Sequence, residues 1–140
     1  MTELALVGDI GGTNSRFGLV EPGSTRIRSV EVLKNNNFGS LEESIGAYVK
    51  MQGISDLTAA AIAVAGPIEG ETVGLTNRDW TFTRESLRKA ALARKFRLLN
   101  DFEALALSLP HLEGDDVVQI GGETPARPAV KIVMGPGTGL

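Results

Sequence analysis

Cysteine and long hydrophobic runs are both absent from the 140-residue sequence. Without cysteine, the chain can form no disulfide bond and can offer no thiolate to a metal ion, and this composition is compatible with the reducing cytoplasm. The longest apolar run, from Ala59 to Ala65, is far shorter than the roughly 20 residues that a membrane-spanning helix needs. The first residues, Met1-Thr2-Glu3, carry an acid where a signal peptide carries positive charge. These absences predict a soluble, cytoplasmic protein with no membrane partner.

Blocks of basic residues are missing as well. The net charge is −3 and the isoelectric point is close to 5.2. Because affinity for nucleic acid depends on clustered Lys and Arg, these values argue against a nucleic-acid partner. Apolar residues make up 42% of the chain and charged residues 22%, which is ordinary for a globular protein able to bury a core.

Apolar runs and turn residues predict three strands at the start of the chain. Leu4 to Val7 is a short continuous apolar run of the kind found in buried strands. A second strand is predicted over residues 16–20, and a third over 27–33 after the Pro22-Gly23 turn. In the third strand, Val30 and Val32 share one face. Together these segments predict an antiparallel meander.

Helices and strands are predicted to alternate after the meander. The capping box Ser40-Leu41-Glu42-Glu43 opens a helix with a single apolar stripe. That stripe consists of Leu41, Ile45, Tyr48 and Val49. Further helices are expected from Thr83 and from Asn100-Asp101, the latter ending at Pro110. Strands are expected over residues 59–65, 96–99 and 130–134, and Gly70 is interpreted as the turn between two short edge segments.

This order of elements predicts an α/β fold in which a mixed sheet, including the meander, has flanking helices. The segment from Leu112 to Arg127 has the weakest pattern and is the best candidate for a boundary. We therefore expect a small N-terminal domain over residues 1–112 and the start of a second, larger domain over 113–140.

A glycine-rich segment, Gly8-Asp9-Ile10-Gly11-Gly12-Thr13, follows the first strand. It matches no Walker loop, which needs Gly-Lys-Ser/Thr, and no dinucleotide loop, which must open into a helix. Here a strand pattern returns after the glycines, so the segment is predicted to be a hairpin tip. A carboxylate such as Asp9 repels a phosphate unless Mg²⁺ lies between them. The segment therefore fits either a Mg-nucleotide hairpin or a plain glycine-rich turn.

Further segments follow in order after this hairpin. They are Ala65-Gly66-Pro67-Ile68, Leu75-Thr76-Asn77-Arg78-Asp79-Trp80, Leu99-Asn100-Asp101-Phe102-Glu103-Ala104 and Gly135-Pro136-Gly137-Thr138-Gly139-Leu140. Each motif alone is only suggestive, but in this order and spacing they closely resemble the bacterial glucokinase family of the hexokinase/actin-like ATPase superfamily. The resemblance extends from Leu6 to Leu140. It implies the N-terminal domain of an actin-like ATPase, which is a ribonuclease H-like fold.

The resemblance also implies a role for individual residues. Those implied to bind ATP are Gly8, Asp9, Ile10, Gly11, Gly12 and Thr13 in a first phosphate loop, and Gly137 and Thr138 in a second. Asp9 is implied to hold Mg²⁺ through water. Asn100, Asp101 and Asn77 are implied to bind the sugar, with Asp101 as the catalytic base that accepts the proton of the 6-hydroxyl.

Asp101 and Trp80 each allow an alternative interpretation from their local context. Asp101 lies where a strand meets a helix, so it is also a natural helix cap. Trp80 belongs to the segment that resembles a sugar-side loop, and a packing role in the core is equally compatible with its sequence context.

The resemblance implies that the whole protein is an ATP-dependent glucokinase of glycolysis, with glucose and ATP as substrates and Mg²⁺ as the metal. A kinase of another hexose and a non-catalytic actin-like nucleotide-binding module are the alternatives. The remaining sugar ligands and the adenine pocket are implied to follow residue 140, so residues 1–140 alone are expected to be inactive. An apolar strand over 130–134 with unpaired edges would favour a homodimer.

Overall fold

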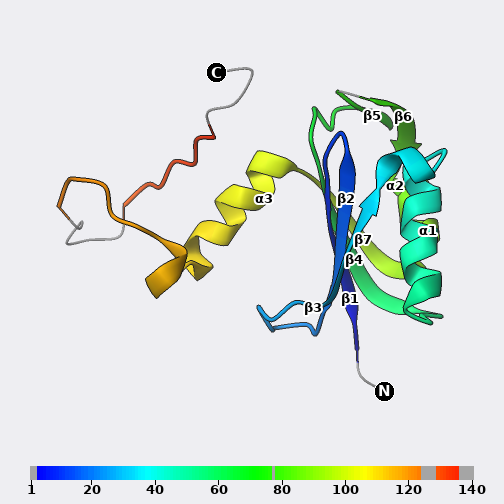
Figure 1. The fold of residues 1–140 in the computed structure, drawn as a ribbon, viewed down its shortest axis with the longest axis horizontal. Helices are drawn as coiled ribbons and strands as arrows, with labels where there is room; N and C mark the ends of the chain where they lie inside the picture. The colour runs from blue at the N-terminus through cyan, green and yellow to red at the C-terminus, as the bar shows by residue number, and fades with distance from the viewer. Residues whose placement is uncertain (1–2, 77, 124–128, 136–140) are drawn as a thin grey trace. The chain divides into compact units, whose positions relative to one another are not determined.

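The computed structural model describes residues 3–76, 78–123 and 129–135, which divide into two compact units, Met1–Asp101 and Phe102–Leu140 (Figure 1). The strands are β1 (Ala5–Ile10), β2 (Asn14–Val20), β3 (Arg28–Lys34), β4 (Leu57–Val64), β5 (Thr72–Leu75), β6 (Arg78–Thr83) and β7 (Ala93–Asn100). The α-helices are α1 (Leu41–Met51), α2 (Arg84–Ala90) and α3 (Asp101–Ser108). Short 3₁₀ turns are η1 (Asn35–Asn37), η2 (Leu109–His111) and η3 (Gly114–Asp116).

The first unit is built on a five-stranded mixed sheet in the order β3-β2-β1-β4-β7. Strands β1, β2 and β3 pair antiparallel, and this confirms the predicted meander. Strand β4 pairs parallel to β1 on one side and to β7 on the other. Parallel neighbours need a crossover connection, and helices α1 and α2 provide it. Strands β5 and β6 form a separate two-stranded sheet.

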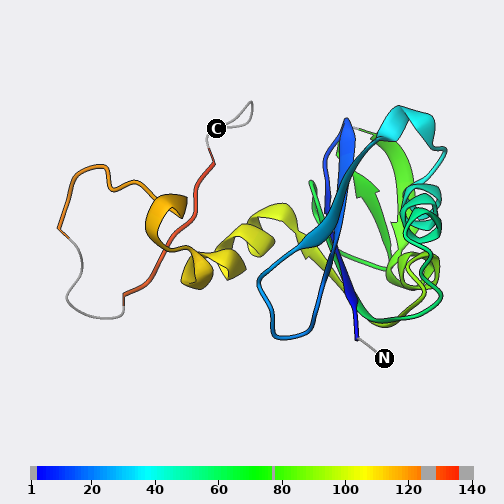
Figure 2. The ribbon, with the colours of Figure 1, turned by 60° about the horizontal axis from the view of Figure 1, so that its bottom comes forward.

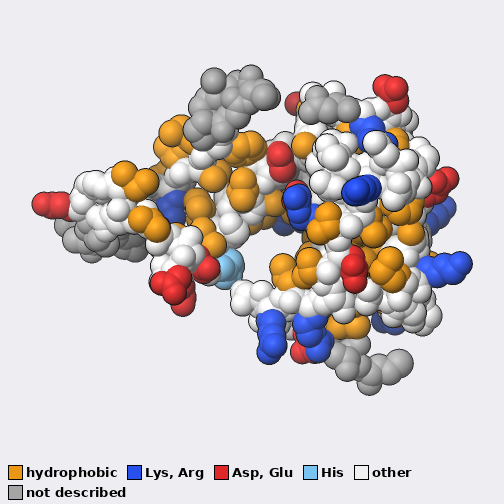
Figure 3. All heavy atoms as spheres, viewed as in Figure 1, with side chains coloured by type: hydrophobic (Ala, Val, Ile, Leu, Met, Phe, Trp, Pro, Cys, Tyr) orange, Lys and Arg blue, Asp and Glu red, His pale blue; other side chains and the backbone are white. Residues whose placement is uncertain are grey.

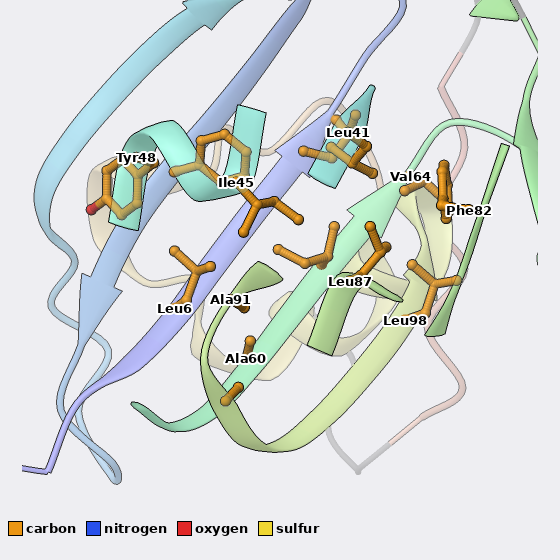
Figure 4. Packing of buried hydrophobic residues seen from close by; sticks show 14 of the residues in the cluster. Leu6, Leu41, Ile45, Tyr48, Ala60, Val64, Phe82, Leu87, Ala91 and Leu98 are labelled. Atoms are coloured by element: carbon orange, nitrogen blue, oxygen red, sulfur yellow. The ribbon is translucent and has the colours of Figure 1, made fainter. Parts of the chain in front are cut away.

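Helices α1 and α2 lie on the same face of the sheet, and the core fills the space between them and the strands (Figures 1 and 2). All four residues of the predicted stripe on α1 are buried, and they meet side chains of β1, such as the fully buried Leu6 (Figure 4). Leu87 on α2 is also fully buried. Each large apolar side chain buried here contributes about 1.5–3 kcal/mol relative to exposure. The core therefore fixes the face of the sheet on which the helices pack.

The opposite face of the sheet carries exposed apolar side chains. Val30 and Val32 share a face, as their spacing predicts, but they are 59% and 53% exposed. Ile27 is 53% exposed and lies against the glycine at position 18, where a Cβ atom would come within 2.4 Å of Ile27 Cγ2. The predicted flanking helices thus cover only one face of the sheet in the described part of the first unit.

Both helices of the first unit begin at the residues that the sequence indicates. The Ser40 hydroxyl accepts a hydrogen bond from the Glu43 amide at 3.2 Å, although the Glu43 carboxylate accepts from the Gly39 amide and not from Ser40. The Thr83 hydroxyl accepts from the Ser86 amide at 3.0 Å, and the Ser86 hydroxyl in turn accepts from the Thr83 amide at 3.1 Å. These caps satisfy donors that the first helical turn would leave without a partner.

Two predictions about secondary structure are wrong. Gly70 does not separate two strands, because β5 and β6 both follow it and turn near Thr76. Residues 130–134 form no strand, because no described segment pairs with them and a strand needs a hydrogen-bonded neighbour.

No described residue of the second unit is buried, and hydrophobic side chains lie at its surface (Figure 3). The large ones are Phe102, Leu105, Leu107, Leu112, Val117, Val118, Ile120, Val130, Ile132 and Met134. The described residues of this unit therefore build no core of their own.

Tyr48 is the only tyrosine of the chain and offers a direct test of the core. Its ring packs 5.3 Å from that of Phe17, and its hydroxyl donates a 2.7 Å hydrogen bond to the Ser29 carbonyl. Burial, together with the nearby Glu31 carboxylate, raises the pKa of Tyr48 to about 12. We expect the tyrosinate absorbance band to appear near pH 12 in the folded chain and near pH 10 in urea.

The same shift predicts how stability depends on pH. Because the folded pKa is the higher one, the contribution of Tyr48 is fully present below pH 10 and is lost as the pH rises from about 10 to 12. Urea unfolding curves of Tyr48→Phe should lose less stability over this range than those of the unsubstituted chain. An absorbance titration of the folded chain centred near pH 10 would contradict the packing described here.

Candidate functional site

The parallel strands of the first unit end together at one edge of the sheet. Ile10 of β1 lies beside Val64 of β4, and Val64 lies beside Asn100 of β7. The segments that follow these three strands therefore start from the same edge. In open α/β sheets, ligands bind outside the carboxyl ends of the strands. This edge is the candidate site, and it brings the glycine hairpin and the Asn100-Asp101 pair to one side of the sheet.

The glycine-rich segment is the tip of the β1–β2 hairpin, as predicted. Strands β1 and β2 pair from Ile10 and Ser15 outward, and the Gly11 amide donates to the Asn14 carbonyl at 3.0 Å across the turn. Residues 11–13 therefore form a tight loop at the carboxyl edge, and no helix follows them. This geometry excludes a dinucleotide loop for the segment.

Gly8 and Ile10 are held by the core as well as by the hairpin. A Cβ atom at Gly8 would come within 2.6 Å of the Ile62 side chain and 3.1 Å of Phe17, so packing explains why glycine is needed here. The Ile10 side chain is fully buried, and its carbonyl accepts from the Ala65 amide at 3.2 Å. Contacts of these two residues with a nucleotide stay predictions.

Asp9 alternates with Gly8 and Ile10 along β1, so its side chain points to the sheet face that the helices leave uncovered. The carboxylate side chain is 58% exposed and lies 3.4 Å from the guanidinium of Arg16, its cross-strand neighbour. Exposed pairs of this kind contribute little to stability, about 0–1 kcal/mol. Asp9 is therefore available at the base of the hairpin at small cost.

Two residues that the sequence analysis did not single out hold the hairpin tip. The Asn35 side chain donates to the Gly11 carbonyl at 2.8 Å, and the Asn35 backbone amide donates to the Thr13 carbonyl at 2.9 Å. The Arg78 guanidinium donates to the Gly12 carbonyl at 3.4 Å. The run Asn35-Asn36-Asn37 is a turn signal in the sequence, but these contacts span 22 residues or more and no local pattern indicates them.

The Asn100-Asp101 pair lies at the junction of β7 and α3. The Asn100 side-chain amide donates to the Gly66 carbonyl at 3.0 Å, which joins β7 to the loop after β4. Helix α3 begins at Asp101 itself, so Asp101 is its first residue and Asn100 precedes it at the cap position. Both residues stand at the carboxyl edge, and Asp101 lies where a strand meets a helix, as predicted. Their roles toward a sugar stay predictions.

Trp80 lies in the β5–β6 sheet and is only 6% exposed within the hydrophobic cluster. This burial favours the packing interpretation of Trp80. An open hollow of about 540 Å³ lies beside it, lined by Leu75, Thr76, Arg78, Asp79 and Trp80. The hollow is adjacent to the segment that resembles a sugar-side loop.

Three predicted site residues, Asn77, Gly137 and Thr138, lie outside the described residues. Among the residues that are described, no group of three or more His, Asp or Glu side chains is placed to hold a metal ion. No helix in the described ranges is both long and apolar enough to cross a membrane.

The fold is that of the N-terminal part of actin-like ATPases of the sugar kinase class. A solved glucokinase from an Antarctic psychrotroph superposes with a TM-score of 0.73 at 32% identity, over 82% of this chain and 37% of that one. A ROK family glucokinase from Streptomyces griseus, solved with glucose and AMPPNP, superposes with a TM-score of 0.58 at 26% identity, over 74% of this chain and 35% of that one.

Sequence comparison gives the family. The family model for glucokinase matches residues 6–140, so the chain belongs to the glucokinase family. The glucokinase of Marinobacter nauticus is 41% identical over 138 residues, which cover 97% of this chain and 42% of that relative. The chain therefore spans well under half the length of the relative that it matches.

Proposed function

We propose that the chain supplies the first nucleotide loop and the sugar base of an ATP-dependent glucokinase. In this reaction the γ-phosphate of ATP passes to the 6-hydroxyl of glucose. The observation that carries the proposal is the alignment of Ile10, Val64 and Asn100 in adjacent strands, because it brings the glycine hairpin and Asp101 to one edge in a chain of this family. Phosphoryl transfer to a hydroxyl needs groups that hold the phosphates and a base positioned close to them.

The proposed chemistry assigns one step to each group. Asp101 accepts the proton of the 6-hydroxyl while the sugar oxygen forms a bond to the γ-phosphorus. The bond from the γ-phosphorus to the bridging oxygen breaks, and ADP leaves with that electron pair. Asn100 hydrogen-bonds a sugar hydroxyl and orients it. Such transfers depend mainly on positioning and on stabilisation of charge, so rigid placement of Asp101 at the end of β7 is the chief contribution of the fold.

The residues present fit a magnesium ion delivered with the nucleotide. Mg²⁺ prefers carboxylate oxygens, keeps several waters, and is usually held by one or two carboxylates together with substrate phosphates. Asp9 offers such a carboxylate at the base of the hairpin, and its exposed bond to Arg16 can exchange for a metal-bound water. The bound ion would neutralise charge on the phosphates.

The domain boundary and the oligomeric state complete the proposal. We propose a domain boundary between a small domain over residues 1–112 and a larger one that begins at residue 113. The two compact units of the structure divide earlier, after Asp101. A homodimer in the cytoplasm is proposed as the working form, supported by the exposed apolar side chains Val130, Ile132 and Met134.

A coupled assay of the complete gene product tests the function. We expect phosphorylation of glucose with Mg-ATP, and weaker use of mannose, fructose and galactose. Preference for another of these hexoses would assign the protein to a different sugar. Binding of ATP without phosphorylation of any hexose would instead support a non-catalytic nucleotide-binding module and contradict the proposal.

A further inference from the structure

The carbonyl oxygens at the tip of the β1–β2 hairpin all accept hydrogen bonds from outside the hairpin. Asn35 binds those of Gly11 and Thr13, at 2.8 and 2.9 Å, and Arg78 binds that of Gly12 at 3.4 Å. Three consecutive carbonyls are thus turned toward η1 and the start of β6. A loop restrained in this way loses the freedom to rotate its peptide planes.

The restraint determines where the amides of the tip point. In a trans peptide, the carbonyl and the following N–H point in opposite directions. When the Gly11 and Gly12 carbonyls face Asn35 and Arg78, the amides of Gly12 and Thr13 must face away from them. Successive backbone amides aimed to one side form an anion-binding concavity. The contacts on the carbonyls therefore set the donors that a phosphate would meet.

Asn35 is itself held in one orientation. It is fully buried, and its side-chain oxygen accepts a 2.7 Å hydrogen bond from the hydroxyl of Ser15, which is also fully buried. That bond fixes the amide nitrogen of Asn35 on the side of the Gly11 carbonyl. Buried polar networks of this kind are rigid when satisfied and costly when broken.

Arg78 connects the hairpin tip to the second sheet. Its guanidinium donates to Asn36 Oδ1 at 3.0 Å as well as to the Gly12 carbonyl, and it lies 4.6 Å from the centre of the Trp80 ring. Trp80 is anchored in the core, and Arg78 is the first residue of β6. The planar guanidinium can stack on a ring and donate at its edge at the same time, which a lysine ammonium cannot do.

We propose that Asn35 and Arg78 are positioning residues for the nucleotide: they hold the carbonyls of the hairpin tip so that its amides face the phosphates. Through Arg78, the β5–β6 sheet, whose turn resembles the sugar-side loop, helps to set the nucleotide loop. The inference rests on the proposed function, since it assumes that Mg-ATP binds at this hairpin.

Kinetics of Arg78→Lys and Asn35→Asp in the complete gene product test the inference. Asn35→Asp replaces the donor facing the Gly11 carbonyl with a carboxylate oxygen, and Arg78→Lys keeps the charge but removes the planar fork. We expect the KM for Mg-ATP to rise about tenfold for Asn35→Asp and about fivefold for Arg78→Lys. The KM for glucose should change less than twofold. A purely structural role would lower the melting temperature without this split between the two KM values.

Arg84→Lys is the matched control. Arg84 also donates to two backbone carbonyls, those of Ile68 and Gly70, each at 2.7 Å, but neither belongs to the hairpin. We expect its KM for Mg-ATP to stay unchanged. If Arg78→Lys affects that KM no more than Arg84→Lys does, the inference is wrong. Should Asn35→Asp fail to fold, Arg78→Lys decides the matter alone.

A second measurement separates this inference from the proposed function. Hydrogen exchange of the ligand-free protein, followed by mass spectrometry of a peptide containing residues 11–14, needs no activity. Arg78→Lys should speed exchange in that peptide, and Arg84→Lys should not. If exchange is faster in Arg78→Lys but the unsubstituted protein phosphorylates no sugar, the restraint on the hairpin is supported and the proposed kinase function is wrong. Unchanged exchange in an active kinase would reject the restraint alone.

Discussion

Replacing Asp101 with asparagine in the complete gene product should lower kcat for glucose by about 10²–10⁴-fold. An amide cannot accept the proton of the 6-hydroxyl, and the loss corresponds to roughly 3–5 kcal/mol of barrier. Glucose binding should stay within a fewfold, because asparagine keeps the size and the hydrogen-bonding capacity of the side chain. Steady-state kinetics with saturating Mg-ATP, together with a glucose-binding titration, would measure both quantities.

This substitution also separates the two interpretations of Asp101. The structure places Asn100 at the cap position and Asp101 in the first turn of α3. A purely structural role there predicts only a small loss of stability, from the lost charge near the helix N-terminus, and little change in rate. Glu103→Gln, on the same helix α3, is the matched control and should leave kcat within about twofold. A kcat for Asp101→Asn close to that of Glu103→Gln would remove Asp101 from the chemistry.

Replacing Asp9 with alanine should raise the Mg²⁺ concentration needed for half-maximal activity by about 10–100-fold, the usual range for groups that hold a metal through its ligands. The KM for glucose should change little, because the proposed partner of Asp9 is the hydrated ion and not the sugar. Activity titrated with Mg²⁺ at fixed ATP would show the shift.

Asp56→Ala is the control for this substitution. Asp56 is also a half-exposed carboxylate paired with an arginine, Arg94, but it precedes β4 and so stands at the opposite edge of the sheet. Loss of either exposed pair should cost little stability. Only Asp9→Ala should change the Mg²⁺ requirement. If activity depends on Mg²⁺ concentration in the same way in the two variants, the hairpin is a plain glycine-rich turn and the role proposed for Asp9 is wrong.

Local patterns predicted the first unit well because its elements carry strong local signals. The stripe on α1 follows the helical period, so Leu41, Ile45 and Tyr48 could be assigned to one buried face before the fold was known. The caps Ser40 and Thr83 are local too, since each binds an amide three residues further along. The hairpin tip was predicted because a strand pattern resumes directly after the glycines.

The errors arise where structure depends on a partner elsewhere. Val130 to Met134 has the composition of a strand, but a strand needs a neighbour, and no described residue provides one. Gly70 looked like a hairpin turn, whereas its carbonyl accepts from the Arg84 side chain and the pairing of β5 with β6 lies beyond it. Neither partner can be inferred from the neighbouring sequence.

The candidate site was predicted in part. The glycine hairpin and the position of Asp101 where a strand meets a helix were predicted, but the alignment of β1, β4 and β7 that brings them to one edge was not. Asn35 and Arg78 were missed because their contacts join segments that are 24 and 66 residues apart. Asn35 lies in a polar run, Asn35-Asn36-Asn37, and nothing in its neighbourhood indicates that it is fully buried.

The order of strands in the first sheet has a consequence for synthesis on the ribosome. Domains fold largely as they emerge from the ribosome. Here one edge of β4 stays unpaired until β7 has been synthesised and can pair with it. Until residues 93–100 have left the exit tunnel, the apolar strand Leu57–Val64 exposes unpaired N–H and C=O groups to any other nascent chain. Strand β7 also carries Asn100 and leads directly into Asp101. A nascent chain therefore acquires the proposed sugar base at the point in synthesis when the open edge of β4 is covered.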